Sequence, residues 1–139
     1  MDQPIRLVEP AREPCIILAN EPRAYREVIA AACWRLRPQL AVTVVEPDEL
    51  DARLRHRGRD ERWLVVHSRP SPAVEAGSFA WVRFAPDGEP GATVGLAGHR
   101  ATLAVVGLDN LLAILDEVVA LARATPPPVR ERPPLHKMT

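Results

Sequence analysis

The chain has 139 residues, a length that suits one domain, since domains typically contain about 100–150 residues. Lys and Arg together number 18, and Asp and Glu also number 18, so the formal net charge is zero. This balance disfavours a general nucleic-acid-binding protein, which needs a basic surface to hold phosphates. The longest apolar run, residues 28–34, is far shorter than the roughly 20 residues of a membrane-spanning helix.

The sequence also indicates a compartment. The first four residues do not begin a basic and then apolar leader segment. The two cysteines, Cys15 and Cys33, form neither a CxxC motif nor a disulfide framework. We therefore expect a cytoplasmic protein without a membrane anchor.

Three short apolar segments predict buried strands in the first half of the chain. They span residues 15–19, 42–45 and 64–66, and each ends at polar or turn-forming residues. Helical patterns over residues 23–37 and 48–57 separate them. Strands that alternate with helices indicate βαβ crossovers and therefore a parallel sheet.

The pattern changes after His67. Residues 68–78 contain Pro70, Pro72 and Gly77, and we expect at most one helical turn there. Apolar and polar residues then alternate around positions 82–84, 94–96 and 103–105, with turns at 86–88 and 97–99, which predicts an antiparallel meander. A long apolar stripe over residues 107–124 predicts a closing helix.

Together these segments predict a small α/β protein with a flavodoxin-like three-layer sandwich. Its front half is a parallel βαβαβ unit, its second half is the antiparallel meander, and the C-terminal helix completes it. Residues 14–124 form this single domain. Residues 1–13 form an extended arm, and residues 125–139 form a flexible tail rich in Pro and Arg.

The two long helices offer candidate contact surfaces. A helical projection places an apolar stripe of the first helix toward the sheet. Its members are Tyr25, Val28, Ile29, Ala32 and Leu36. Trp34 then falls on the outer face beside Ala30 and Ala31, where it is either a contact for a protein partner or covered by the arm or tail. In the last helix, Ile114 and Leu121 form a second apolar flank, which is either a homodimer surface or a contact with the first helix.

Polar residues follow the predicted parallel strands. In an open parallel sheet, ligands bind in the crevice beyond the carboxyl ends of the strands. The residues at those ends are Asn20, Glu21, Glu46, His67, Ser68 and Arg69. They form our candidate ligand crevice, although strand ends are also polar simply because the chain leaves the core there.

No catalytic residue, cofactor or metal site is predicted. Glu21, Glu46 and His67 are residue types that bind transition metals, but they come from three strand ends and have no diagnostic spacing. The glycines of the second half fit neither dinucleotide-binding nor phosphate-loop motifs. Ser68 beside His67 is not a nucleophile–base pair by adjacency alone, because catalytic pairing is spatial.

A cluster of arginines is the densest local positive charge. It contains Arg53, Arg55, Arg57 and Arg59. Arginines are favoured near the C-terminus of a helix, so a solvated helix end accounts for them, and docking of an acidic protein is the sharper alternative. Nucleic acid is the least favoured partner, because groove-reading or aromatic partners are not apparent nearby.

The segment from Ile17 to Glu27 resembles the opening of a response-regulator receiver domain. It is an apolar strand that ends at Asn20 and Glu21 and leads into a helix. In that family an acidic pair at this place holds magnesium, and the third strand ends in the aspartate that accepts phosphate. The segment from Leu64 to His67 resembles that third strand. The resemblance covers residues 15–70 and, loosely, the last helix.

The sequence departs from the family at each reactive position. Asn20 replaces one carboxylate, and His67, or Ser68 after a one-residue shift, stands at the acceptor position. Of the 18 basic residues 17 are arginine, and Lys137 is the only lysine. The family has a conserved lysine at its fifth strand, and the predicted domain of this chain contains no lysine that could take its place. Magnesium prefers several anionic oxygens. The resemblance therefore implies a degenerate receiver that has lost aspartyl phosphorylation.

From this we expect a non-catalytic regulatory or protein-interaction module that binds a protein partner and forms a homodimer. The alternative is a small-molecule-binding protein or weak enzyme that uses the crevice at the strand ends.

Overall fold

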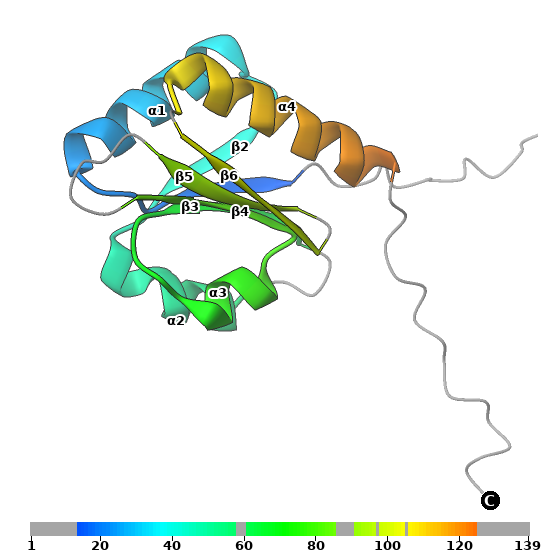
Figure 1. Ribbon diagram of the computed structural model, residues 1–139. Coiled ribbons are helices and arrows are strands. Elements are labelled where there is room, and N and C mark those ends of the chain that lie inside the picture. The colour runs from blue at the N-terminus through cyan, green and yellow to red at the C-terminus, as the bar shows by residue number, and fades with distance from the viewer. Residues whose placement is uncertain (1–13, 58–60, 86–90, 97, 105, 125–139) are drawn as a thin grey trace, which may run out of the picture.

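A six-stranded sheet lies between two layers of helices in the computed structural model, which describes residues 14–57, 61–85, 91–96, 98–104 and 106–124 (Figure 1). Helices α1 (Arg23–Leu36) and α4 (Leu108–Ala124) cover one face, and α2 (Leu50–Arg55) and α3 (Pro72–Gly77) lie on the other. The prediction of an α/β architecture is confirmed. The predicted arm and tail lie outside the described residues.

The sheet is parallel in one part and antiparallel in the other. Its strands are β1 (Cys15–Leu18), β2 (Ala41–Val44), β3 (Trp63–His67), β4 (Ala80–Phe84), β5 (Ala92–Leu96) and β6 (His99–Leu103). They lie in the order β2-β1-β3-β4-β5-β6. Strands β1 to β4 are parallel to one another, whereas β5 is antiparallel to both β4 and β6. The predicted parallel front strands and the antiparallel second half are both confirmed.

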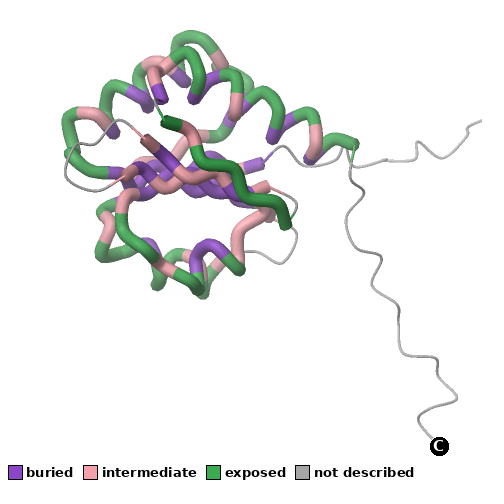
Figure 2. Tube along the Cα trace, viewed as in Figure 1, coloured by how far each residue is buried: buried purple, intermediate pink, exposed green. Residues whose placement is uncertain are grey.

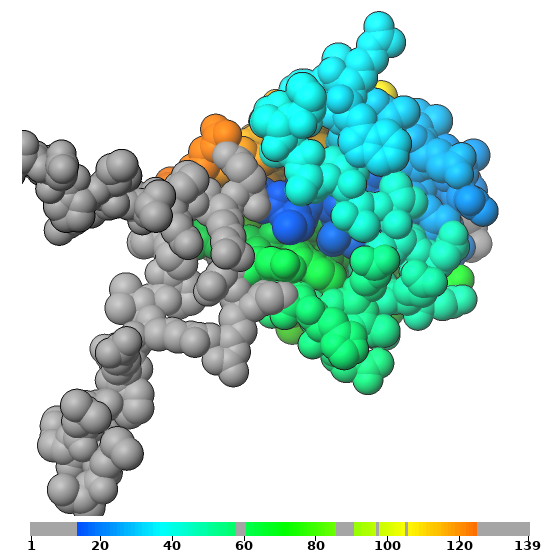
Figure 3. Space-filling view, turned by 180° about the vertical axis from the view of Figure 1, so that it is seen from behind, coloured from blue at the N-terminus to red at the C-terminus, as the bar shows by residue number. Residues whose placement is uncertain are grey.

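The central strand β3 is buried along its whole length because helices cover both of its faces. Leu64 and Val66 pack in the core beneath α1 and α4, while Val65 packs in the second core beneath α2 and α3. Such a strand needs apolar side chains on both faces, so it reads as an unbroken apolar run rather than an alternating one. Seen from behind, part of β1 (dark blue) is visible at the surface (Figure 3). The segment around β2 (cyan) lies above it, and the layer of α2 and α3 (green) lies below it.

Helix α1 is rotated relative to the sequence prediction. Its buried residues are Arg26, Ile29, Ala30 and Cys33. Val28 and Leu36, predicted to face the sheet, are 53% and 50% exposed, and Ala30, predicted on the outer face, is 1% exposed. The buried face also contains the charged Arg26, which forms an ion pair with Glu46. The small Ala30 and Cys33 let the helix pack closely on the sheet, and Val28 and Leu36 remain largely exposed.

The second half of the chain follows the prediction in outline, but its last strand, β6, covers residues 99–103 rather than lying around 103–105. Helix α4 buries the apolar stripe that the sequence indicates and is joined to the residue after α1 by a bidentate ion pair. Arg37 Nε and Nη2 lie 2.7 and 2.8 Å from the two carboxylate oxygens of Asp116, and hydrogen bonding to Arg37 lowers the pKa of that carboxyl. Helix α3 has six residues, more than the single turn expected. Among the described helices, none has the length and apolarity needed to cross a membrane.

The sheet becomes progressively more exposed toward β6. Residues of β6 are largely exposed, whereas those of β3 and β4 are mostly buried (Figure 2). Gly98, in the turn between β5 and β6, has a φ of +81°, a conformation that glycine adopts without a steric penalty. On the face away from α1 and α4, Gly95 leaves room for the indole of Trp81, which lies against the backbone of β5.

We expect Gly95→Ala to destabilise the fold by about 1–3 kcal/mol, the usual cost of overpacking a filled site. A Cβ at this position would overlap Cε2 and Nε1 of Trp81, which is itself 5% exposed. The free energy of unfolding from urea denaturation measures the effect.

Gly77→Ala is the matched control. Its Cβ would lie 3.3 Å from Cδ2 of Leu54, the far end of a flexible side chain that can move aside. We expect a change within about 0.5 kcal/mol, the range usual for substitutions away from tightly packed sites. Equal effects of the two substitutions would contradict the packing of Trp81 on β5.

Candidate functional site

The polar residues at the strand ends do gather at one edge of the sheet, as the parallel topology requires. Ser68 Oγ accepts a hydrogen bond from the backbone N–H of Glu21 at 3.0 Å, which links the end of β3 to the end of β1. Arg69 Nη2 lies 2.7 Å from Oε1 of Glu21. Glu21, Ser68 and Arg69 therefore form a connected group.

Glu46 is placed differently from its neighbours. Its two carboxylate oxygens each lie 3.3 Å from Nη2 of Arg26. Arg26 lies on the buried face of α1 and is 2% exposed. Leaving a buried guanidinium without a counter-ion is costly, so Glu46 serves to neutralise Arg26. Of the six candidate residues at the strand ends, His67 and Arg69 line the cavity at this edge, and Glu46 is instead paired with Arg26.

Arg69 forms a bridge across the strand ends. Besides Glu21, it contacts Asp48, with Nη1 lying 2.8 Å from Oδ1. The hydrogen bond to Asp48 and the negative charge of Glu21 are the two main causes that raise the pKa of the Arg69 guanidinium, so this residue stays cationic. A fixed positive charge thus lies between the carboxylates that follow β1 and β2.

A cavity of about 280 Å³ opens at this edge. Its polar lining comes from Asp48, Asp51, His67, Arg69 and Ser71. The sequence reasoning missed Asp48 and Asp51 because it considered only the residues directly after each strand. Both belong to the turn and short helix that follow β2, and the acidic run near Pro47 is the signal that could have identified them.

Several polar atoms beneath this edge lack a hydrogen-bond partner among the described residues. They are both amide atoms of Asn20 and Nε and Nη1 of Arg26. Each such buried group costs about 1–3 kcal/mol, so native structures contain few of them. Asn20 lies at the end of β1 and Arg26 on the buried face of α1, so these groups distinguish this region from the apolar core.

His67 belongs to a cluster of buried charged and polar side chains. Its Nε2 lies 3.2 Å from Oε2 of Glu75, and the two side chains are 3% and 6% exposed. Arg83 Nη1 contacts both carboxylate oxygens of Glu75, at 3.1 and 2.9 Å. This cluster ties α3 to β3 and β4. The sequence analysis did not single out Glu75 or Arg83, although a charged residue within the apolar strand Ala80–Phe84 signals a partner on the neighbouring layer.

Burial lowers the pKa of His67 below its ordinary value of 6.5. The negative charge of Glu75 and hydrogen bonding by the backbone of Arg69 oppose this shift, but removal of the imidazole from water outweighs them. His67 is therefore neutral at neutral pH, and its position at the end of β3 carries no charge.

The geometry does not suit magnesium of the receiver type. Asn20 is a buried amide, Glu21 is held by Arg69, and His67, a neutral imidazole, ends β3. Within the described ranges, no three His, Cys, Asp or Glu side chains are grouped so as to hold a metal ion.

The other candidate residues lie away from this edge. Trp34 is 56% exposed on α1, and Ala31 is exposed beside it. On α4, Ile114 packs partly against the core, and Leu121 is half-buried.

The predicted basic patch is only partly a free surface. Arg53 and Arg55 are exposed at the end of α2. Arg57 donates a hydrogen bond to the carbonyl of Gly77 and so joins α2 to α3. Arg59 lies outside the described residues.

Comparison of the chain with protein-family models, with curated proteins and with solved structures finds no match.

Acidification is expected to reduce the stability of the protein partly through His67. The unfolded chain protonates its imidazole near the ordinary pKa of 6.5, whereas the folded protein holds this group neutral to lower pH. The unfolded state then binds more protons, so the free energy of unfolding falls as the pH drops below about 6.5 toward the lowered pKa.

His67→Gln removes this contribution. Urea denaturation at about pH 7.5 and about pH 5.5, the range over which histidine titrates, should show a smaller loss of stability in the variant than in the wild type. An equal loss in both proteins would show that His67 is not held neutral by burial.

Proposed function

We propose that this protein is a non-catalytic regulatory module on a receiver-like scaffold, acting in the cytoplasm through contact with protein partners. The order of its parallel strands, β2-β1-β3-β4, is the order with which flavodoxin-like sheets begin, which supports the resemblance. The antiparallel β5 and β6 are a departure from that fold.

The observation that carries the proposal is the bridge of Arg69 between Glu21 and Asp48. Its guanidinium lies 2.7 and 2.8 Å from these two carboxylates. In a receiver domain the acidic residues at this edge are available to a divalent cation. Here an arginine of the chain already compensates them, and a second cation would have to displace it. The scaffold is thereby suited to a fixed state rather than to one set by phosphorylation.

A small-molecule site at this same edge is the weaker alternative. The cavity measures about 280 Å³, at or below the lower end of the roughly 300–1,000 Å³ found for small-molecule pockets. Most of its charges are also already paired with one another.

The proposed contact surface is the part of α1 around Trp34. Val28, Trp34 and Leu36 are the large apolar side chains of the described residues that remain mostly exposed, and all three belong to this helix. Tryptophan is enriched among the residues that dominate binding energy at interfaces. We infer that Trp34 contributes to a homodimer, with Ala31 beside it and the Ile114 and Leu121 flank of α4 as the further surface.

Incubation with acetyl phosphate and magnesium tests the loss of phosphorylation. We expect no increase in intact mass, because no aspartate stands at the end of β3 and Arg69 holds the carboxylates near it. A receiver domain with an intact acceptor serves as the positive control. Stoichiometric addition of phosphate to this chain would falsify the proposal.

Trp34→Ala tests the contact surface. Removal of a central tryptophan typically costs about 2 kcal/mol or more in binding free energy, about 30-fold in the dissociation constant. Light scattering over a concentration series should therefore show a shift from dimer to monomer. Arg53→Ala, an exposed substitution on the opposite helical layer, should leave the mass unchanged. A monomeric wild type, or equal masses for wild type and Trp34→Ala, would exclude this dimer.

A further inference from the structure

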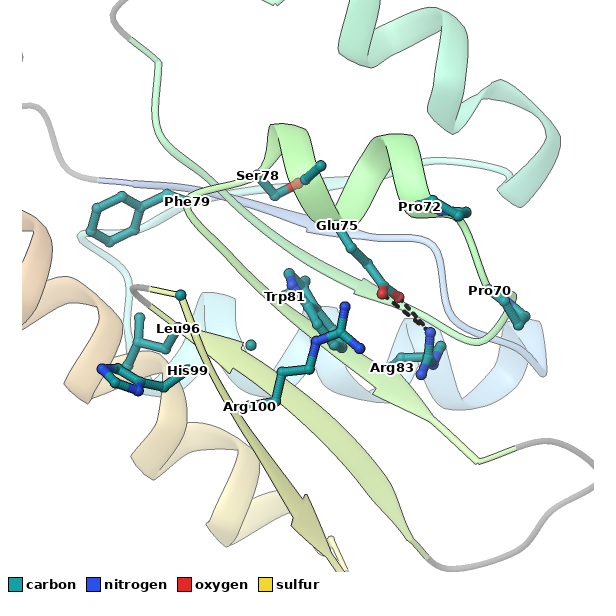
Figure 4. Close-up of a pocket in the computed structure, with 13 residues that line it drawn as sticks. Pro70, Pro72, Glu75, Ser78, Phe79, Trp81, Arg83, Leu96, His99 and Arg100 are labelled. Carbon is teal, nitrogen blue, oxygen red and sulfur yellow. Dashed lines mark hydrogen bonds and ion pairs between the residues drawn. The ribbon is translucent and has the colours of Figure 1, made fainter.

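An open groove lies on the face of β4, β5 and β6 that points away from α1 and α4 (Figure 4). Helix α3 forms one wall, and β6 forms the other. Its volume is about 640 Å³, well within the roughly 300–1,000 Å³ of small-molecule sites. Past Arg83 it continues into a second hollow of about 550 Å³ lined by the ends of β4, β5 and β6. This groove is separate from the cavity at the strand ends.

The strand register brings two arginines onto one tryptophan. Trp81 pairs with Gly95, and Gly95 pairs with Arg100, so Trp81 and Arg100 lie on the same face with no side chain between them. The Cζ atom of Arg100 lies 5.4 Å from the centre of the indole ring, and that of Arg83 lies 5.5 Å from it. Stacking on the indole holds both guanidinium groups in place at the floor of the groove.

The two arginines differ in their counter-charges. Arg83 is neutralised by the buried carboxylate of Glu75, as the dashed lines in Figure 4 show. Arg100 is exposed, and no carboxylate among the described residues forms an ion pair with it. The floor of the groove therefore has an excess positive charge, and the donors of Arg100 remain available to a ligand.

Apolar side chains line the two ends of the groove. The half-buried Phe79 lies at one end, and Pro70 and Pro72 lie at the other. An inorganic ion alone would leave these surfaces in water. A ligand with an apolar body and one acidic group would contact both parts of the site.

We propose that this groove binds a small organic anion, a carboxylate or phosphate ester with an apolar body. Arg100 donates hydrogen bonds to its oxygens, and Trp81 orients Arg100. Because a stacked guanidinium is already ordered, binding loses less side-chain entropy than it would with a free arginine. Glu75 keeps Arg83 neutralised, so the anionic group is directed to Arg100. The proposal does not depend on whether the scaffold is phosphorylated or dimeric.

Titrations with benzoate, phenyl phosphate and benzamide at constant ionic strength test the site. Two-dimensional ¹H–¹⁵N spectra follow the Trp81 indole and the Arg100 side chain. We expect shifts of these signals with benzoate or phenyl phosphate, and the tighter of the two identifies the acidic group. Benzamide, neutral and of nearly the same shape, should bind at least about tenfold more weakly, since charge-assisted hydrogen bonds are worth about one decade or more in affinity.

Arg100→Gln should weaken binding of the anion at least about tenfold, whereas Arg35→Gln, an exposed arginine on α1, should not change it. The unshifted signals of the remaining residues show whether each variant is folded. Equal binding of benzamide, equal weakening by both substitutions, or shifts confined to residues outside the groove would each overturn the proposal. An absence of shifts with both anions would do the same.

Discussion

The parallel pairing of β3 with β4 is the constraint on which most of this structure depends. Parallel neighbours need a crossover, usually of about a dozen residues or more, and residues 68–79 supply one that is barely long enough. The helix within it, α3, is short and covers only the region next to β3. As a result no helix of the described part of the chain covers β5 and β6 on that face, and the groove over β4–β6 remains open (Figure 4).

Glu75 fastens this short crossover to the sheet. Its carboxylate lies against His67 of β3 and Arg83 of β4, so one buried charge connects three elements. Removing water from these groups is costly, and the cost is offset only where the pairing is close. The carboxylate of Glu75 also balances the charge of Arg83. Arg100 is then the cation of the groove that has no ionic partner among the described side chains.

Arginine is the cation in the ion pairs with Asp and Glu that the described residues form. Arg69 bridges Glu21 and Asp48, Arg26 meets Glu46, and Arg37 holds Asp116. A planar guanidinium can contact two carboxylate oxygens at once, or two carboxylates, which an ammonium group does less well. The preference for arginine over lysine in the composition thus corresponds to particular contacts between strand ends and helices.

The sequence was sufficient to predict the elements whose signal is local. The apolar runs of β1 and β3 and the long stripe of α4 located those elements, because burial on one or two faces leaves a clear pattern. The orientation of α1 was missed because Arg26 is buried and charged, and only the position of Glu46 explains that. Glu75, Arg83 and Arg100 were missed for a related reason, since residues far apart in the sequence meet only through strand register.

The position of Arg100 has one more consequence, for behaviour at high concentration. Of the described strands, β5 alone pairs with β6, so the outer backbone groups of β6 could pair with a strand from another molecule. Native proteins commonly place charged side chains on such edges because like charges repel when two edges approach. Arg100 and the adjacent polar residues of β6 therefore also disfavour pairing of this edge with another molecule. An apolar residue at this position would lower solubility and favour self-association.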